Sequence, residues 1–244
     1  MKTVLITGAN KSIGLETAAQ LAAQGYHVYI GSRDIQKGEE AVVQLKAKGL
    51  TTIEAVQIDV TSQASIDAAR DTIAKKSGSL DVLINNAGIS GGMPQDPLTL
   101  PIDTVRKVYD TNLFGVITVT QGFYHLLEKS PEPRIVNVTS GLGSLTAHSD
   151  PNSPYYAIKS AAYGPSKTAL NAYTVSLAYA LRELPFKVNA VDPGYTSTAF
   201  NNFRGPGSVE RAAQIIVKYA TLGADGPTGK YFSNDLNPGG ECPW

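Results

Sequence analysis

Residues 3–14 read Thr-Val-Leu-Ile-Thr-Gly-Ala-Asn-Lys-Ser-Ile-Gly, and this segment sets the architecture of the chain. Its first five residues are apolar or β-branched and predict a strand, while residues 15–24 are amphipathic and predict a helix closed by Gly25. A glycine-rich turn in this context can bind a phosphate, because the backbone approaches closely and the helix N-terminus offers free N–H groups. From this segment alone, an ordinary strand-to-helix turn is the alternative.

The remainder of the chain alternates between strand and helix patterns. Further strands are predicted at residues 28–32, 53–58, 81–85, 134–139, 186–191 and 230–232, and helices at residues 34–48, 62–76, 102–127 (in one or two pieces) and 161–184. Such alternation implies right-handed crossovers and a parallel sheet covered by helices on both faces. The sequence therefore predicts one α/β domain over residues 1–244, without internal repeats.

Composition limits the partners and the environment. The formal net charge is zero, and charged residues make up only 17% without a basic block, so neither nucleic acid nor an acidic membrane surface is an expected partner. Cys242 is the only cysteine, and the N-terminus lacks the apolar core of a signal peptide, so a cytoplasmic location is expected. His27, His125 and His148 lack ligand spacing, and no metal site is expected.

A phenol and an amine lie four residues apart at Tyr163 and Lys167. Residues at this spacing share one helix face, so both side chains can converge on one substrate. A neighbouring cation lowers a tyrosine pKa from about 10, which would make the phenol an acid/base catalyst. Tyr155 and Lys159 repeat the spacing, but they follow Pro154 in a polar stretch where the helix register is doubtful. Tyr163 is favoured because it opens an apolar helical pattern.

Polar or glycine-rich residues follow each of six predicted strands. The carboxyl ends of parallel strands share one rim, where ligands bind in such sheets. Each residue alone has an ordinary explanation as a helix cap or a turn, but six together indicate a binding site. The segments are residues 8–14, Arg33 with Asp34, Asp59 with Val60, residues 85–88, Thr139 with Ser140, and residues 192–198.

In this order, these residues resemble the short-chain dehydrogenase/reductase family and, within it, the NADPH-dependent carbonyl reductase branch. The matching residues are Thr7-Gly-Ala-Asn-Lys-Ser-Ile-Gly14, Asp59-Val60, Asn85-Asn-Ala-Gly88, Asn112, Ser140, Tyr163 with Lys167, and Pro193-Gly194. The resemblance implies a single-domain Rossmann fold, with a doubly wound parallel sheet of about seven strands flanked by helices. It also implies hydride transfer between a nicotinamide cofactor and a carbonyl or alcohol.

The resemblance assigns catalytic roles to four residues. Tyr163 would donate its proton to the carbonyl oxygen, and Lys167 would lower the phenol pKa and hold the nicotinamide ribose. Ser140, favoured over Thr139, would hydrogen-bond the substrate oxygen. Asn112 would hold a water behind Lys167, with a cap at a helix break as the alternative. The expected cofactor-binding residues are Gly8, Asn10, Lys11, Ser12, Ile13, Gly14, Arg33, Asp59, Val60, Asn86, Tyr163, Lys167, Pro193, Thr196 and Thr198.

Arg33 and Asp34 give opposing signals for the cofactor. An acid after the second strand binds the adenosine ribose of NAD, whereas an arginine accommodates the 2′-phosphate of NADP. We interpret Asp34 as a helix cap and expect NADP(H). Lys11 and Lys37 are further candidate cations, although Lys37 fits a solvated helix face equally well.

Three features depart from the family pattern. Ser12 stands where the family usually has glycine, and a serine fits there only if the backbone avoids positive φ. The segment between Ser140 and Tyr163 is long and resembles the insertion of monomeric carbonyl reductases, so a monomer is favoured over a homo-oligomer. No role is predicted for residues 234–244.

The expected partner is a small-molecule carbonyl compound. Tyr195, Phe200 and Phe203 in a predicted lid over residues 195–204 suggest an apolar ketone or aldehyde, with surface packing as the alternative. Two other functions are considered: another nicotinamide-dependent reaction such as epimerisation, and non-catalytic nucleotide sensing. The complete set of four catalytic candidates favours catalysis over sensing.

Overall fold

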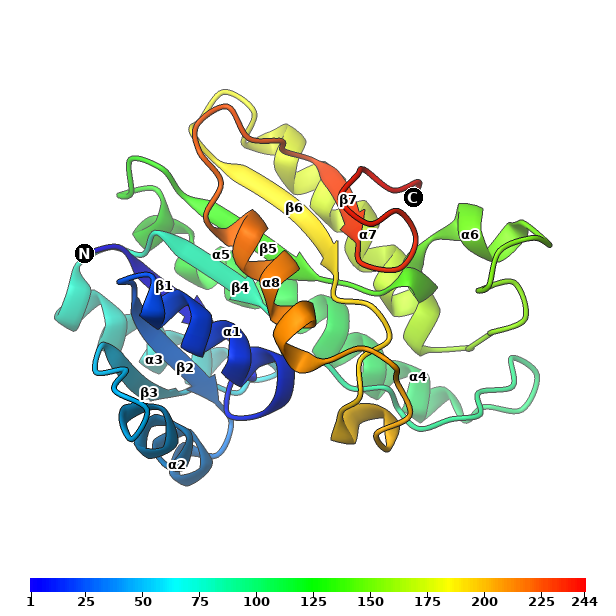
Figure 1. Cartoon of the computed structure of the whole chain (residues 1–244), viewed down its shortest axis with the longest axis horizontal. Coiled ribbons are helices and arrows are strands. Elements are labelled where there is room, and N and C mark those ends of the chain that lie inside the picture. Colours follow the sequence, from blue (N-terminus) through cyan, green and yellow to red (C-terminus); the bar gives the residue numbers. More distant parts are fainter.

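The computed structural model describes all 244 residues, and its centre is one parallel sheet of seven strands in the order β3-β2-β1-β4-β5-β6-β7 (Figure 1). The strands are β1 (Thr3–Ile6), β2 (His27–Ser32), β3 (Ile53–Gln57), β4 (Val82–Asn85), β5 (Arg134–Val138), β6 (Lys187–Asp192) and β7 (Lys230–Ser233). The strand order reverses between β1 and β4, which is where a doubly wound sheet opens a ligand crevice. The predicted single Rossmann-like domain with about seven strands is confirmed.

Helices cover both faces of this sheet, with α1, α2 and α8 on one face and α3, α5 and α7 on the other (Figure 1). The helices are α1 (Ser12–Ala23), α2 (Ile35–Lys46), α3 (Gln63–Ser77), α4 (Ile102–Tyr109), α5 (Gly115–Leu127), α6 (Leu145–Ser149), α7 (Tyr163–Ala180) and α8 (Val209–Ala220). Short 3₁₀ turns span Gly141–Gly143 and Ala199–Asn201.

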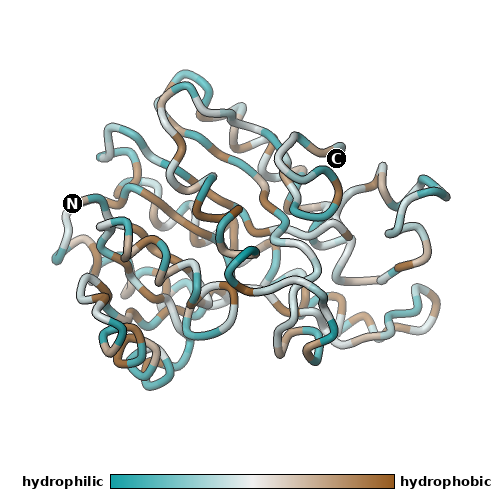
Figure 2. Tube along the Cα trace, viewed as in Figure 1, coloured by the Kyte–Doolittle hydropathy of each residue, from teal (hydrophilic) through white to brown (hydrophobic).

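Two apolar cores follow from the alternation of side chains along the strands. Val4 and Ile6 of β1 belong to the core under α1, α2 and α8, whereas Leu5 between them faces the opposite core. Figure 2 shows apolar residues concentrated along the strands and the inner parts of the helices. Because both faces are covered, the strands are nearly continuous apolar runs.

Two predicted helices differ in detail from the observed ones. The predicted helix over residues 102–127 consists of α4 and α5 joined by a π-helical turn at Asp110–Phe114. The predicted helix over residues 161–184 is shorter, since α7 begins at Tyr163 and ends at Ala180. Tyr163 is therefore the first residue of its helix.

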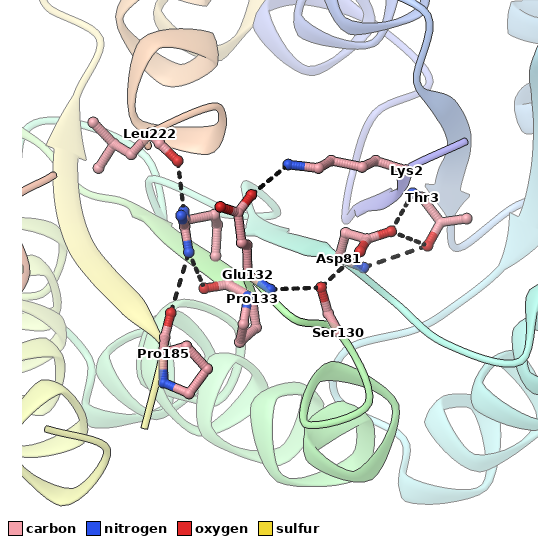
Figure 3. Close-up of polar contacts among 9 residues, drawn as sticks. Lys2, Thr3, Asp81, Ser130, Glu132, Pro133, Pro185 and Leu222 are labelled. Atoms are coloured by element: carbon pink, nitrogen blue, oxygen red, sulfur yellow. Dashed lines mark hydrogen bonds and ion pairs between the residues drawn. The ribbon is translucent and has the colours of Figure 1, made fainter. Parts of the chain in front are cut away.

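A polar network connects the amino ends of β1, β4 and β5 (Figure 3). The glycine-rich turn lies at the other end of these strands. The carboxylate of Asp81 accepts hydrogen bonds from Thr3 N at 2.7 Å and from Ser130 Oγ at 2.6 Å. The buried Arg134 guanidinium donates to the carbonyls of Pro133, Pro185 and Leu222. Because these groups bond to protein partners, with only the Nη2 atom of Arg134 left without one, this end of the sheet serves stability.

The C-terminal segment over residues 234–244 packs back onto the domain. Cys242 N donates to Tyr231 O at 2.8 Å, and the Trp244 ring stacks on Tyr231 with centroids 5.6 Å apart. Thr146 N in α6 donates to Trp244 O at 3.0 Å. This segment therefore connects β7 to the insertion that contains α6.

None of the helices combines the length and the apolar character needed to cross a lipid bilayer.

Candidate active site

The glycine-rich turn lies against the loop that follows β4. A Cβ added at Gly14 would lie 2.7 Å from Asn86 Nδ2, and one at Gly8 would lie 2.9 Å from Ala87 Cα. Asn86 Nδ2 donates to Thr7 O at 2.9 Å and to Gly8 O at 3.2 Å. Only glycine fits at these two positions, and Asn86 supports the turn rather than pointing away from it.

The N-terminus of α1 is open to an anion. Lys11 occupies the cap position with an extended backbone, and no side chain caps the first turn. Free N–H groups at a helix N-terminus bind phosphate through hydrogen bonds and the helix dipole. Ser12, Ile13 and Gly14 begin α1, and Asn10 directly precedes the cap residue Lys11.

The expectation for the Ser12 backbone is wrong. Ser12 has φ = +52°, in the left-handed region that favours glycine. A residue with a Cβ costs roughly 1–2 kcal/mol in this conformation. The turn therefore keeps the backbone geometry typical of glycine and carries strain at Ser12.

Near the end of β2, the carboxylate of Asp34 has protein partners, whereas the cations around it differ in whether they are paired. Asp34 caps α2, since its Oδ1 accepts from Gln36 N at 3.0 Å, and its interpretation as a helix cap is confirmed. Lys37 Nζ lies 3.7 Å from Asp34 Oδ2, so Lys37 is paired on the helix face. The exposed side chains of Arg33 and Lys11 form no ion pair or hydrogen bond. Two free cations therefore border the crevice.

Asp59 and Val60 support the loop after β3. Burial acts to raise the pKa of Asp59, but hydrogen bonds from the Thr61 hydroxyl and N–H lower it below its usual range. Val60 packs on α5, because a Cβ at Gly115 would lie 2.9 Å from Val60 Cγ2. Both residues therefore have protein contacts that hold this part of the rim.

Tyr163 and Lys167 lie one turn apart on α7 and converge, as the spacing predicts. The Lys167 ammonium lies 5.9 Å from the centroid of the Tyr163 ring and donates to Val138 O at 2.8 Å. A Cβ at Gly88 would lie 3.7 Å from Lys167 Nζ, so the loop after β4 also borders this amine. The Phe200 ring lies 5.5 Å from the Tyr163 ring and forms a wall beside the phenol.

The electrostatics of this pair differ from the expectation. Burial raises the pKa of Tyr163 above its ordinary value of 10, a hydrogen bond with Ser140 acts in the opposite direction, and Asp192 adds to the increase. Burial lowers the pKa of Lys167 to about 8, against the effect of Asp192. The charge of Lys167 does not offset this increase in the phenol pKa, because burial dominates and Nζ donates to Val138 O. The phenol is protonated at neutral pH.

Ser140 rather than Thr139 is available beside the phenol. Thr139 is buried, and its hydroxyl donates to Asn171 Oδ1 at 2.7 Å. Ser140 Oγ accepts from Leu142 N at 3.2 Å and lies close enough to the Tyr163 phenol to lower its pKa. Its hydroxyl hydrogen is therefore free to interact with the phenol or with a substrate oxygen.

Asn112 lies in the π-helical turn and is fully buried. Its Oδ1 accepts from Ile89 N at 2.9 Å, and its Nδ2 donates to Ile89 O and to Ser166 Oγ. Ser166 Oγ in turn donates to Tyr163 O at 2.7 Å. Both amide donors are used, so only one oxygen lone pair is left for the predicted water. The side chain connects the loop after β4 to the first turn of α7.

The second tyrosine–lysine pair does not converge. Tyr155 lies in a turn, and its hydroxyl lies 3.3 Å from Asp235 Oδ2. Lys159 Nζ donates to His148 O at 2.6 Å. Tyr155 instead packs on Gly141, where an added Cβ would lie 2.6 Å from Tyr155 Cζ. The geometry therefore favours Tyr163 as the catalytic tyrosine.

The loop after β6 closes the site from the other side. Thr196 and Thr198 are buried, and Thr196 Oγ1 donates to Gly194 O at 3.1 Å. Asp192 is 3% exposed and accepts from Gly194 N at 3.0 Å and from Ser233 Oγ at 2.6 Å. Burial raises the pKa of Asp192 to about 6. The sequence placed Asp192 after the sixth strand, but nothing there indicated that it is buried near Tyr163 and Lys167.

Comparison with known proteins gives the class of this site. A family model described as short chain dehydrogenase matches residues 2–207, and the chain belongs to this family. Short-chain dehydrogenase anuI of Penicillium roqueforti is 39% identical over 226 residues, covering 91% of this chain and 89% of that protein. (−)-Isopiperitenone reductase of Mentha piperita is 32% identical, covering 95% of this chain and 96% of that protein.

A solved structure agrees with this class. Salutaridine reductase from Papaver somniferum superposes with a TM-score of 0.84 at 30% identity, covering 96% of this chain and all of that one (100%). The chain is thus a short-chain dehydrogenase of the carbonyl reductase type, an oxidoreductase family member acting on carbonyl or alcohol groups.

Proposed function

We propose that this chain is an NADPH-dependent carbonyl reductase that reduces a ketone or aldehyde, with residues 1–244 forming one cofactor-binding and catalytic domain. The observation that carries the proposal is the convergence of the Tyr163 phenol and the Lys167 amine at the carboxyl ends of the strands, with the Ser140 hydroxyl beside the phenol. A proton donor and a hydrogen-bond donor at one point are what a developing alkoxide requires.

In the proposed reaction, Tyr163 transfers its proton to the substrate oxygen as that oxygen gains negative charge. Ser140 donates a hydrogen bond to the same oxygen and orients the carbonyl. Bound NADPH supplies the hydride. Lys167 holds a positive charge near the phenol, since its pKa of about 8 keeps the amine largely protonated at neutral pH. That charge stabilises the phenolate left after proton transfer.

The preference for NADPH rests on the residues beside β2. Asp34 is used to cap α2 and pairs with Lys37, whereas Arg33 and Lys11 are exposed and unpaired. The uncapped N-terminus of α1 and the close contact of Gly14 with Asn86 fit a bound pyrophosphate. The residues present therefore fit a phosphorylated dinucleotide.

The reductive direction and the substrate class have further support. The names of (−)-isopiperitenone reductase and salutaridine reductase describe reductases of small molecules. Phe200 beside Tyr163 and the exposed Tyr195 and Phe203 favour an apolar substrate. We also propose a monomer, because the insertion between Ser140 and Tyr163 contacts α7, where Gly164 N donates to Ser160 Oγ at 2.7 Å and Thr168 Oγ1 donates to Gly143 O at 3.0 Å.

The test is turnover of NADPH with a panel of aldehydes and ketones, followed by the absorbance of the reduced cofactor. Wild-type protein is expected to oxidise NADPH with apolar carbonyls. Tyr163→Phe is expected to lose about 10²–10⁴-fold in kcat, because it lacks the acidic proton. Tyr155→Phe is the matched control and is expected to keep wild-type turnover.

A Tyr163→Phe protein with wild-type kcat would overturn the assignment of Tyr163 as the proton donor. An inactive Tyr155→Phe protein would indicate that Tyr155 is the proton donor instead. A wild-type protein that binds NADPH and reduces no carbonyl would support nucleotide sensing or another nicotinamide-dependent reaction instead.

A further inference from the structure

The catalytic helix begins without a cap of its own. Ala162 occupies the cap position of α7 and has no side-chain oxygen, although the first N–H groups of a helix have no partner within it. Gly164 N donates to Ser160 Oγ at 2.7 Å, and Pro165 has no N–H. The N–H of Tyr163 itself therefore requires an acceptor from elsewhere in the chain.

Gln95 provides this acceptor from a distance of 68 residues along the sequence. Its Oε1 accepts from Ala162 N and from Tyr163 N, both at 3.0 Å. The side chain is 3% exposed, so water does not compete for these bonds. Gln95 is the hydrogen-bond partner of the catalytic tyrosine's own backbone.

The other end of the same amide organises the loop after β4. Gln95 Nε2 donates to Ser90 O at 2.6 Å and to Gly92 O at 2.9 Å. Gly91 and Gly92 have φ of +76° and +85°, and a Cβ at Gly91 would lie 3.2 Å from Gln95 Nε2. The loop curls around the amide, whose two donors and two acceptor sites are all used.

We infer that Gln95 is a positioning residue that holds Tyr163 in its productive place. Tyr163 is the first residue of α7, and terminal residues of helices are the ones that fray. Without the Gln95 acceptor, the first turn loosens and the phenol loses its fixed distance to Ser140. This inference rests on the proposed function in that Tyr163 is the acid, and a misplacement of about 1 Å can cost about 10²-fold in rate.

The experiment compares three variants by kcat, by affinity for NADPH and by hydrogen exchange of the Tyr163 amide. Gln95→Met keeps the length and removes the acceptor, and it is expected to lower kcat at least about tenfold with NADPH affinity within about twofold. Gln95→Glu keeps the acceptor but, when protonated, donates to only one of the carbonyls of Ser90 and Gly92, so it is expected to lose less kcat than Gln95→Met. Ser62→Ala removes the cap of α3 in the same way and is expected to leave kcat unchanged.

Exchange of the Tyr163 amide is expected to accelerate in Gln95→Met but not in Ser62→Ala. The inference is overturned if folded Gln95→Met has wild-type kcat, if Gln95→Glu loses as much as Gln95→Met, or if exchange is unchanged. If the wild-type protein reduces no carbonyl compound, the proposed function fails, whereas the exchange measurement still tests the link between Gln95 and Tyr163.

Discussion

Replacing Asp192 by asparagine tests the electrostatics of the site, because this carboxyl group is buried beside the proposed catalytic residues. Burial raises the pKa of Asp192 from 3.8 to about 6, although hydrogen bonds from Ser233 and Gly194 oppose the shift. The folded protein therefore binds this proton more tightly than the unfolded chain. The resulting stabilisation is complete below pH 3.8 and is lost as the pH rises through about 6.

The full shift corresponds to about 3 kcal/mol in the free energy of unfolding, of which about 2 kcal/mol falls between about pH 4.5 and about pH 7.5. The assay is urea unfolding of wild type and Asp192→Asn at these two pH values, so that titrations common to both proteins cancel. We compare the free energy of unfolding of the variant minus that of wild type. This difference is expected to be about 2 kcal/mol larger at the higher pH than at the lower pH. Asp225→Asn, at an exposed position, controls for the change in net charge.

The reasoning is refuted if the stability difference between wild type and Asp192→Asn is the same at both pH values. Such a result would mean that the carboxyl group titrates alike in the folded and unfolded states.

Three further predictions concern the proposed cofactor site and the amine of Lys167. Arg33→Ala is expected to raise KM for NADPH about tenfold, through loss of a charge-assisted hydrogen bond, with little effect on KM for NADH; an unchanged KM for NADPH contradicts the assignment. The kcat is expected to fall as the pH rises past about 8, where Lys167 loses its proton, so a pH–rate profile that stays flat there excludes a role for the ammonium. Ser12→Gly is expected to raise the free energy of unfolding by up to about 1 kcal/mol, since it relieves left-handed strain and partly offsets this by the freedom of glycine in the unfolded chain. A lower thermal midpoint for Ser12→Gly would show that the serine side chain makes a contact that outweighs the strain.

Local patterns in the sequence were enough for the architecture and for most of the proposed site. Apolar, β-branched runs at the strands, alternating with amphipathic helical patterns, predicted a parallel sheet covered on both faces, because strands that are buried on both sides are apolar throughout. The spacing of Tyr163 and Lys167 predicted their convergence on one helix face. The rim residues were predictable because the carboxyl ends of parallel strands meet at one edge of the sheet.

Contacts between distant segments, and the burial that they create, were decided only by the tertiary structure. Gln95 accepts a hydrogen bond from Tyr163 N because the loop after β4 meets the start of α7. No sequence pattern predicts this contact between distant segments. The raised pKa of Tyr163 and of Asp192 depends on exclusion of water by packed neighbours, which the order of residues does not state. The positive φ of Ser12 has the same origin: the surrounding turn imposes a backbone conformation that serine on its own does not favour.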